Sequence, residues 1–267
     1  MQKDNMKNLD IVRKNFKDKL KKREKLFGGW VSFGHASITE TFSYAGFDFL
    51  AIDMEHSTIS LDEAQRIIAS SQSENIPCFP RPVSHSNDWF KPLLDSGADG
   101  VIVSTVETVE EVENIINCIK YPPVGKRTYG VNRAQKYGFD TKEYFSKWNE
   151  SSVIIIQIES IKAVNNIEKL IEFKDIDGVM IGPYDLSGSL GIPGETTHPL
   201  VIEASKKVIK ACNDSGKSCG TQIADPNDKN LKELFDLGYT FAILGSDLFA
   251  LWKWSQKMSE LIKNYKP

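Results

Sequence analysis

The sequence predicts an α/β protein of the (β/α)₈ TIM-barrel class, preceded by one helix and followed by another. From residue 28 onward, short apolar runs alternate with amphipathic stretches, the pattern of a parallel sheet wrapped by helices. The length of 267 residues fits one barrel of ~250 residues. Several predicted strands also end in polar residues, as they do in barrels whose active sites lie at the carboxyl ends of the strands.

The predicted elements follow in chain order. Residues 7–25 carry apolar side chains at helical spacing and should form a leading helix. Strands are expected at 29–34, 48–54, 77–81, 100–104, 153–159, 178–181, 218–223 and 241–244. Helices are expected at 61–73, 88–96, 109–119, 163–173, 201–213, 231–237 and 248–262. We expect one domain over 1–267, made of a leading segment (1–26), a barrel (28–247) and a C-terminal helix (248–267).

One segment breaks this alternation. Residues 121–150 contain two prolines and three glycines between a predicted helix and a predicted strand. A long insert at a barrel rim is usually functional or forms an interface.

Composition favours a small-molecule partner. The net charge of −3 gives no electrostatic reason to expect nucleic acid. The four cysteines are scattered without a CxxC pair, which is typical of reduced thiols. The N-terminus is charged and lacks an apolar signal core, and no apolar run is long enough to cross a membrane. We therefore expect a cytoplasmic protein.

Two carboxylates end neighbouring predicted strands. Glu159 closes the fifth strand and Asp185 follows the sixth, so both could reach one hard cation. Two carboxylates with water commonly hold Mg²⁺ or Mn²⁺ and leave positions open for a chelating substrate; Co²⁺ is a further candidate. The alternative for Asp185 is a role at the entry of the following helix.

An arginine and a histidine end two other strands. Arg81 ends an apolar strand and could hold a carboxylate or an enolate through parallel hydrogen bonds. Its alternative is a structural ion pair with Asp53 or Asp95. His56 lies three residues after Asp53, close enough for the carboxylate to orient the ring, and an imidazole suits proton transfer near neutral pH.

Several reaction types lack their residues. No predicted strand contains a lysine, so a Schiff-base route to an enamine has no nucleophile in the barrel interior. P-loop, GxSxG and dinucleotide GxGxxG motifs are absent from the sequence. Any enolate would then depend on a metal ion for stabilisation.

Five segments resemble a known family. They are residues 45–48 with 52–56, 94–98, 121–127, 157–159 and 181–186. In this order they resemble the HpcH/HpaI aldolases, which include 4-hydroxy-2-oxoheptanedioate, 2-keto-3-deoxy-L-rhamnonate and 2-dehydro-3-deoxyglucarate aldolases. The resemblance runs from about residue 28 to the C-terminal region.

The resemblance implies roles for individual residues. Glu159 and Asp185 would bind the divalent metal, and His56 would be the acid/base. Arg81 and Gln157 would hold the oxygens of pyruvate.

Further roles also come from the resemblance. Asp53 and Asp95 would orient His56 or its water, Asp95 from a neighbouring subunit. Gly182, Pro183 and Tyr184 would contact substrate. Family members are usually hexamers, trimers of dimers that exchange their final helix, so the resemblance implies a domain-swapped C-terminal helix.

The implied activity is that of a class II aldolase. It would reversibly cleave a 2-keto-3-deoxy or 4-hydroxy-2-oxo acid into pyruvate and an aldehyde through a metal-bound pyruvate enolate. Two segments depart from the family pattern: residues 104–107 (Ser-Thr-Val-Glu), where relatives usually carry Pro-Met before the valine, and the short loop 129–133, expected to reshape the aldehyde pocket. The alternatives are an oxaloacetate decarboxylase, another enolate lyase on the same site, and a non-catalytic binding protein.

Overall fold

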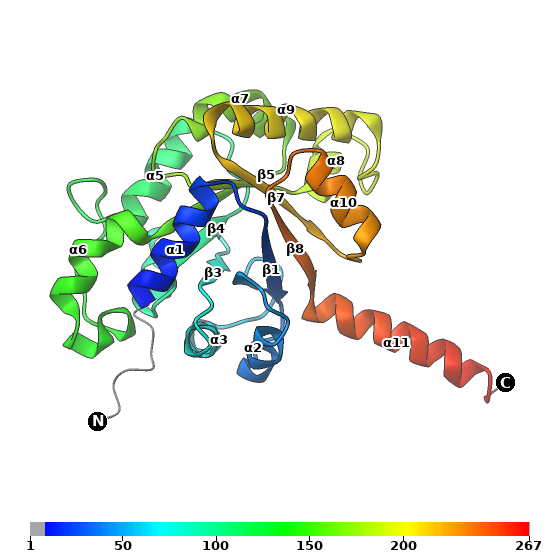
Figure 1. Cartoon of the computed structure of the whole chain (residues 1–267), viewed down its shortest axis with the longest axis horizontal. Helices are drawn as coiled ribbons and strands as arrows, with labels where there is room; N and C mark the ends of the chain where they lie inside the picture. The colour runs from blue at the N-terminus through cyan, green and yellow to red at the C-terminus, as the bar shows by residue number, and fades with distance from the viewer. Residues whose placement is uncertain (1–8, 267) are drawn as a thin grey trace.

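The computed structural model describes residues 9–266, and its centre is a nearly closed barrel of eight parallel strands (Figure 1). Neighbouring strands follow the order β3-β2-β1-β8-β7-β6-β5-β4. The two end strands meet where the Asp99 amide donates to the Cys78 carbonyl oxygen at 3.0 Å. The strands are β1 (Leu26–Val31), β2 (Phe49–Asp53), β3 (Cys78–Arg81), β4 (Gly100–Val103), β5 (Val153–Ile158), β6 (Gly178–Ile181), β7 (Ser218–Ile223) and β8 (Phe241–Ser246).

Helices surround the strands, as the alternation of apolar and amphipathic segments predicts (Figure 1). They are α1 (Leu9–Lys21), α2 (Ala36–Ser43), α3 (Leu61–Ser73), α4 (Asn87–Asp95), α5 (Val109–Ile119), α6 (Thr141–Ser151), α7 (Ile161–Ile171), α8 (Pro183–Ser189), α9 (Pro199–Ser215), α10 (Asp228–Asp236) and α11 (Asp247–Lys263), with a 3₁₀ segment η1 (Arg133–Gly138). The predicted barrel is confirmed. Helices α2, α6 and α8 were not predicted, and residues 7 and 8 of the expected leading helix lie outside the described residues.

Helix α1 covers the amino-terminal opening of the barrel. Phe16 contacts the rings of Phe49 and Phe79 inside the barrel, with centroids 5.3 and 5.0 Å away. Buried ion pairs fasten the same helix, Arg13 to Asp99 at 3.0 Å and Lys17 to Asp177 at 2.8 Å. The carboxyl end of the barrel is therefore the end left open for a ligand.

The insert 121–150 lies at the closed end. It connects α5 to β5 and contains η1 and α6. Arg133 of η1 donates to Gln72 Oε1 at 2.8 Å and to the Ser96 carbonyl at 3.0 Å, and both acceptors lie where helices α3 and α4 end. A connection from a helix to the next strand lies at the end of the barrel opposite the carboxyl ends of the strands. The expectation that loop 129–133 shapes the aldehyde pocket is therefore wrong for the pocket of its own chain.

Helix α11 projects away from the barrel (Figure 1). Leu251, Trp252 and Trp254 are 52%, 52% and 60% exposed, so this helix leaves a large apolar surface uncovered. Among residues 9–266, no helix has the length and apolar character needed to cross a lipid bilayer.

Candidate active site

A cavity of about 360 Å³ opens at the carboxyl ends of the strands. Its wall contains most of the predicted site residues together with aromatic and hydroxyl side chains. The lining residues are Trp30, Ser32, Asp53, His56, Arg81, Gln157, Met180, Ile181, Gly182, Pro183, Tyr184, Asp185, Gln222, Ala224, Ser246, Leu248 and Phe249.

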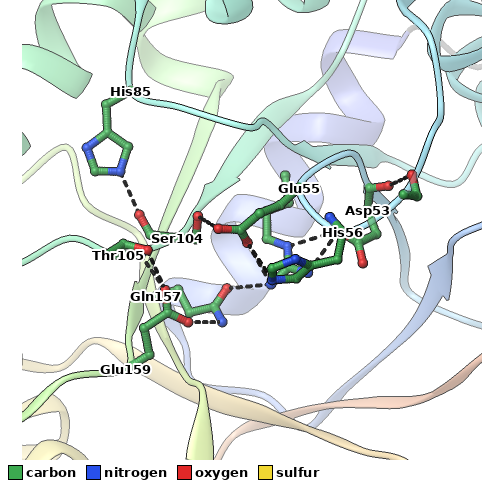
Figure 2. Close-up of polar contacts among 10 residues, drawn as sticks. Asp53, Glu55, His56, His85, Ser104, Thr105, Gln157 and Glu159 are labelled. Atoms are coloured by element: carbon green, nitrogen blue, oxygen red, sulfur yellow. Dashed lines mark hydrogen bonds and ion pairs between the residues drawn. The ribbon is translucent and has the colours of Figure 1, made fainter. Parts of the chain in front are cut away.

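The end of β2 supplies two acidic side chains and the histidine (Figure 2). The Asp53 carboxylate accepts a hydrogen bond from the His56 backbone amide at 3.1 Å. The His56 ring instead faces the next carboxylate, with Nε2 3.7 Å from Glu55 Oε2. Glu55, which was not assigned a role from the sequence, is therefore the acidic group beside the imidazole.

Arg81, at the end of β3, joins the acidic groups to one another. Its guanidinium lies 2.8 Å from Asp53 Oδ1 and 3.1 Å from Glu55 Oε2, and it lies over the Trp30 ring at 4.7 Å. Burial alone would raise the pKa of the Asp53 carboxyl, but the Arg81 charge lowers that pKa below its ordinary value. Arg81 therefore forms the structural ion pair with Asp53 that was the alternative to a binding role. It also lines the cavity, where it can contact a ligand.

The end of β5 supplies an amide and a carboxylate (Figure 2). Gln157 accepts from Arg81 at 3.4 Å and donates to Glu159 Oε2 at 2.6 Å. The other oxygen of Glu159 accepts from both the Thr105 amide, at 2.6 Å, and the Thr105 hydroxyl, at 2.8 Å. Gly182 lies against this pair, since a Cβ there would come within 2.9 Å of both Gln157 Nε2 and Glu159 Oε2.

Glu159 is a buried carboxylate without a cationic partner. Within residues 9–266, it forms no ion pair with a lysine, arginine or histidine. Burial raises its pKa and outweighs the Thr105 hydrogen bond, and the carboxylates of Glu55 and Asp185 raise it further. This surplus of negative charge fits a bound divalent cation, which prefers oxygen ligands.

Asp185 lies in the first turn of α8, exposed at the wall of the cavity. The N-cap residue of α8 is Gly182, so Asp185 is not the cap. In the described chain, no group of three or more His, Cys, Asp or Glu side chains forms a metal site. A cation held by Glu159 and Asp185 would therefore complete its coordination with water and substrate.

Asp95 lies apart from this cavity. It ends α4 and contacts Arg127 at 2.8 Å, a guanidinium that also lies over the rings of Tyr121 and Trp148. Within one chain, Asp95 does not reach His56, and its predicted role could come only from a second copy.

Residues 26–253 match the model of the HpcH/HpaI aldolase/citrate lyase family. The chain belongs to this family. It is 34% identical over 240 residues to a hydroxypyruvate/pyruvate aldolase of Roseobacter denitrificans, with 88% of this chain and 92% of that protein covered. It is 31% identical over 234 residues to a 2-keto-3-deoxy-L-rhamnonate aldolase of Escherichia coli, with 87% of this chain and 86% of that protein covered.

Solved structures agree with this assignment to the HpcH/HpaI family. A crystal structure of an HpcH/HpaI aldolase from Desulfitobacterium hafniense matches with a TM-score of 0.86 at 26% identity, over 92% of this chain and 96% of that one. The family resemblance read from the sequence is confirmed, and the chain is similar to aldolases over most of its length.

Proposed function

We propose that this chain is a metal-dependent, class II aldolase that reversibly cleaves a 2-keto-3-deoxy or 4-hydroxy-2-oxo acid into pyruvate and an aldehyde. The observation that carries the proposal is the buried Glu159 carboxylate, which has no cationic partner among residues 9–266 and lies near Asp185 at the open end of the barrel. Membership of an aldolase family and the pyruvate aldolase relative support the reaction class.

Glu159 and Asp185 would hold the cation, Mg²⁺ or Mn²⁺ in the first place and Co²⁺ as a third candidate. When bound, the metal supplies Lewis acidity that polarises the keto group of pyruvate and stabilises the negative charge of the enolate. Gly182 packs directly against Glu159, because a Cβ there would come within 2.9 Å of Oε2, so a larger residue would displace the carboxylate.

Arg81 and Gln157 would bind the oxygens of pyruvate. The Arg81 guanidinium is already oriented by Asp53, Glu55 and the Trp30 ring, so little of its rotamer entropy remains to be lost on binding. Such preorganised donors stabilise charge that develops on an enolate oxygen. Gly182, Pro183 and Tyr184 form the facing wall of the cavity.

His56 would move the proton. Its side chain is 67% exposed at the cavity, and its Nε2 lies 3.7 Å from Glu55 Oε2. In the cleavage direction His56 would take the proton of the hydroxyl group on the carbon whose carbon–carbon bond breaks, and would return it to the methylene carbon of the enolate, which becomes the methyl group of pyruvate. Synthesis would follow the same steps in reverse.

The cavity wall favours this route over a Schiff base. Among the described residues that line it, none is a lysine, so the amine needed for an imine with pyruvate is missing there.

We also propose assembly into a hexamer built from dimers that exchange α11. The exposed Leu251, Trp252 and Trp254 side chains support this, since contiguous apolar surface of this kind marks an interface. A second copy could also bring Asp95 to the site. The four free cysteines, three of them buried, support a reducing compartment such as the cytoplasm.

The test is cleavage of 2-oxo acids with release of pyruvate measured enzymatically, with Mg²⁺, with Mn²⁺ and after chelation. We expect metal-dependent release from a 4-hydroxy-2-oxo acid, and its loss in Glu159→Gln but not in Glu143→Gln, a control on the exposed face of α6. If the protein released pyruvate from oxaloacetate but not from a 4-hydroxy-2-oxo acid, its activity would be that of an oxaloacetate decarboxylase. No turnover of either acid would contradict an enolate enzyme and leave the binding-protein alternative.

A further inference from the structure

A closed ring of contacts joins the carboxyl ends of four strands, β2 to β5, and two of its members, Arg81 and Gln157, line the cavity (Figure 2). Ser104 donates to Glu55 Oε1 at 2.7 Å, and Glu55 Oε2 pairs with Arg81. Arg81 donates to Gln157, and Gln157 donates to Glu159 Oε2. Glu159 Oε1 accepts from Thr105, the residue next to Ser104 in the chain, which closes the ring. The hydroxyl groups of two consecutive residues therefore each donate to one glutamate: Ser104 to Glu55 and Thr105 to Glu159.

Thr105 has a backbone conformation that a threonine rarely adopts. Its φ is +54°, in the left-handed region, where a β-branched residue is strained. Such strain persists where the surroundings over-determine it, often at functional sites. Here the conformation accompanies the donation of both the amide and the hydroxyl of Thr105 to one oxygen of Glu159.

Ser104 is held from the other side. It is buried, and its carbonyl oxygen lies 2.6 Å from His85 Nε2. The His85 carbonyl in turn accepts from Asn114 of α5 at 3.0 Å. Ser104 therefore lies between Glu55 and His85, whereas Thr105 is exposed and contacts Glu159.

We propose that Thr105, supported by Ser104, is a positioning residue that fixes Glu159 in the orientation in which it binds the divalent cation. This inference rests on the metal site proposed above. Two donors of Thr105 occupy Oε1, whereas among residues 9–266 only Gln157 donates to Oε2, so Oε2 is the oxygen with a lone pair left for a cation. Residues that orient a metal ligand in this way typically change metal affinity ~10–100-fold when replaced.

The test measures Mn²⁺ affinity of the full chain by electron paramagnetic resonance, alongside thermal unfolding of the same samples. Thr105→Val removes only the hydroxyl donor and should weaken Mn²⁺ binding by about tenfold, while Thr105→Ser keeps the hydroxyl and should bind as the native protein does. Thr41→Val, at an exposed hydroxyl that donates to the Ser37 carbonyl, is the matched control and should not change affinity.

Thr105→Gly separates positioning from a purely structural role. Glycine relieves the strain at positive φ, so we expect unchanged or higher unfolding temperature together with weaker Mn²⁺ binding. Affinity equal to native in both Thr105→Val and Thr105→Gly would overturn the inference and leave the metal site intact. If the native protein bound no Mn²⁺, or if Glu159→Gln bound Mn²⁺ as tightly as the native protein, both this inference and the proposed function would be overturned.

Discussion

Replacing Arg81 with methionine should strongly destabilise the protein at neutral pH. The guanidinium and the Asp53 carboxylate are each only 9% exposed, and the variant would leave both Asp53 and Glu55 without their cation. Breaking a buried pair by removing one partner costs about 3–5 kcal/mol. In a domain of this size that corresponds to a fall of roughly 6–20 °C in melting temperature.

The loss should also depend on pH. Arg81 holds the pKa of Asp53 below its ordinary value, so the ion pair contributes stability above that ordinary value, and the contribution is lost as pH falls through the lowered native pKa. The difference between native protein and variant should therefore be large near pH 7 and shrink only as the pH falls below the ordinary pKa of 3.8.

Urea unfolding of both proteins across this pH range provides the measurement. Arg66→Met is the matched control, because its pair with Asp62 is exposed on both sides, 69% and 67%, and such pairs contribute only about 0–1 kcal/mol. The reasoning would be refuted if Arg81→Met lost no more stability than Arg66→Met at neutral pH.

Phe16→Ala should cost about 3–5 kcal/mol in urea unfolding, because this buried ring closes the barrel; a loss under about 1 kcal/mol would contradict that role. His56→Ala should lower kcat by ~10²–10⁴ with Mn²⁺ affinity unchanged by titration, and unchanged kcat would remove it as the acid/base. Burial lowers the pKa of Lys120 to about 7, so the stability of the native protein should rise with pH above this value relative to that of Lys120→Met; parallel pH profiles in urea unfolding would contradict it.

Most of the strands were predictable because they are short runs of buried apolar residues, as in β2, β4, β5 and β6. Helix α2 was not, because only Thr39 is buried in it, so it carries no apolar periodicity. Helix α6 does bury Tyr144 and Trp148 four residues apart, but the surrounding prolines and glycines favoured an irregular segment. The sequence pattern therefore did not predict a helix that buries few side chains, such as α2, or a helix that lies within an insert, such as α6.

The site was predictable to the extent that residues at strand ends share one rim. Asp53, Arg81 and Gln157 met as expected. The side-chain direction of Glu55, beyond the end of β2, is not fixed by strand alternation, and a positive φ at Thr105 leaves no signal in a threonine. Asp95 could not be placed from sequence because its partner, Arg127, is distant along the chain.

We propose that the enolate of pyruvate forms at this site with the aid of a cation held by Glu159. NMR of pyruvate in D₂O tests it directly, by following loss of the methyl proton signal with Mg²⁺, with Mn²⁺ and with chelator. We predict exchange that requires the metal in the native protein and disappears in Glu159→Ala. Absence of exchange with either metal, or equal exchange in the variant, would contradict the claim.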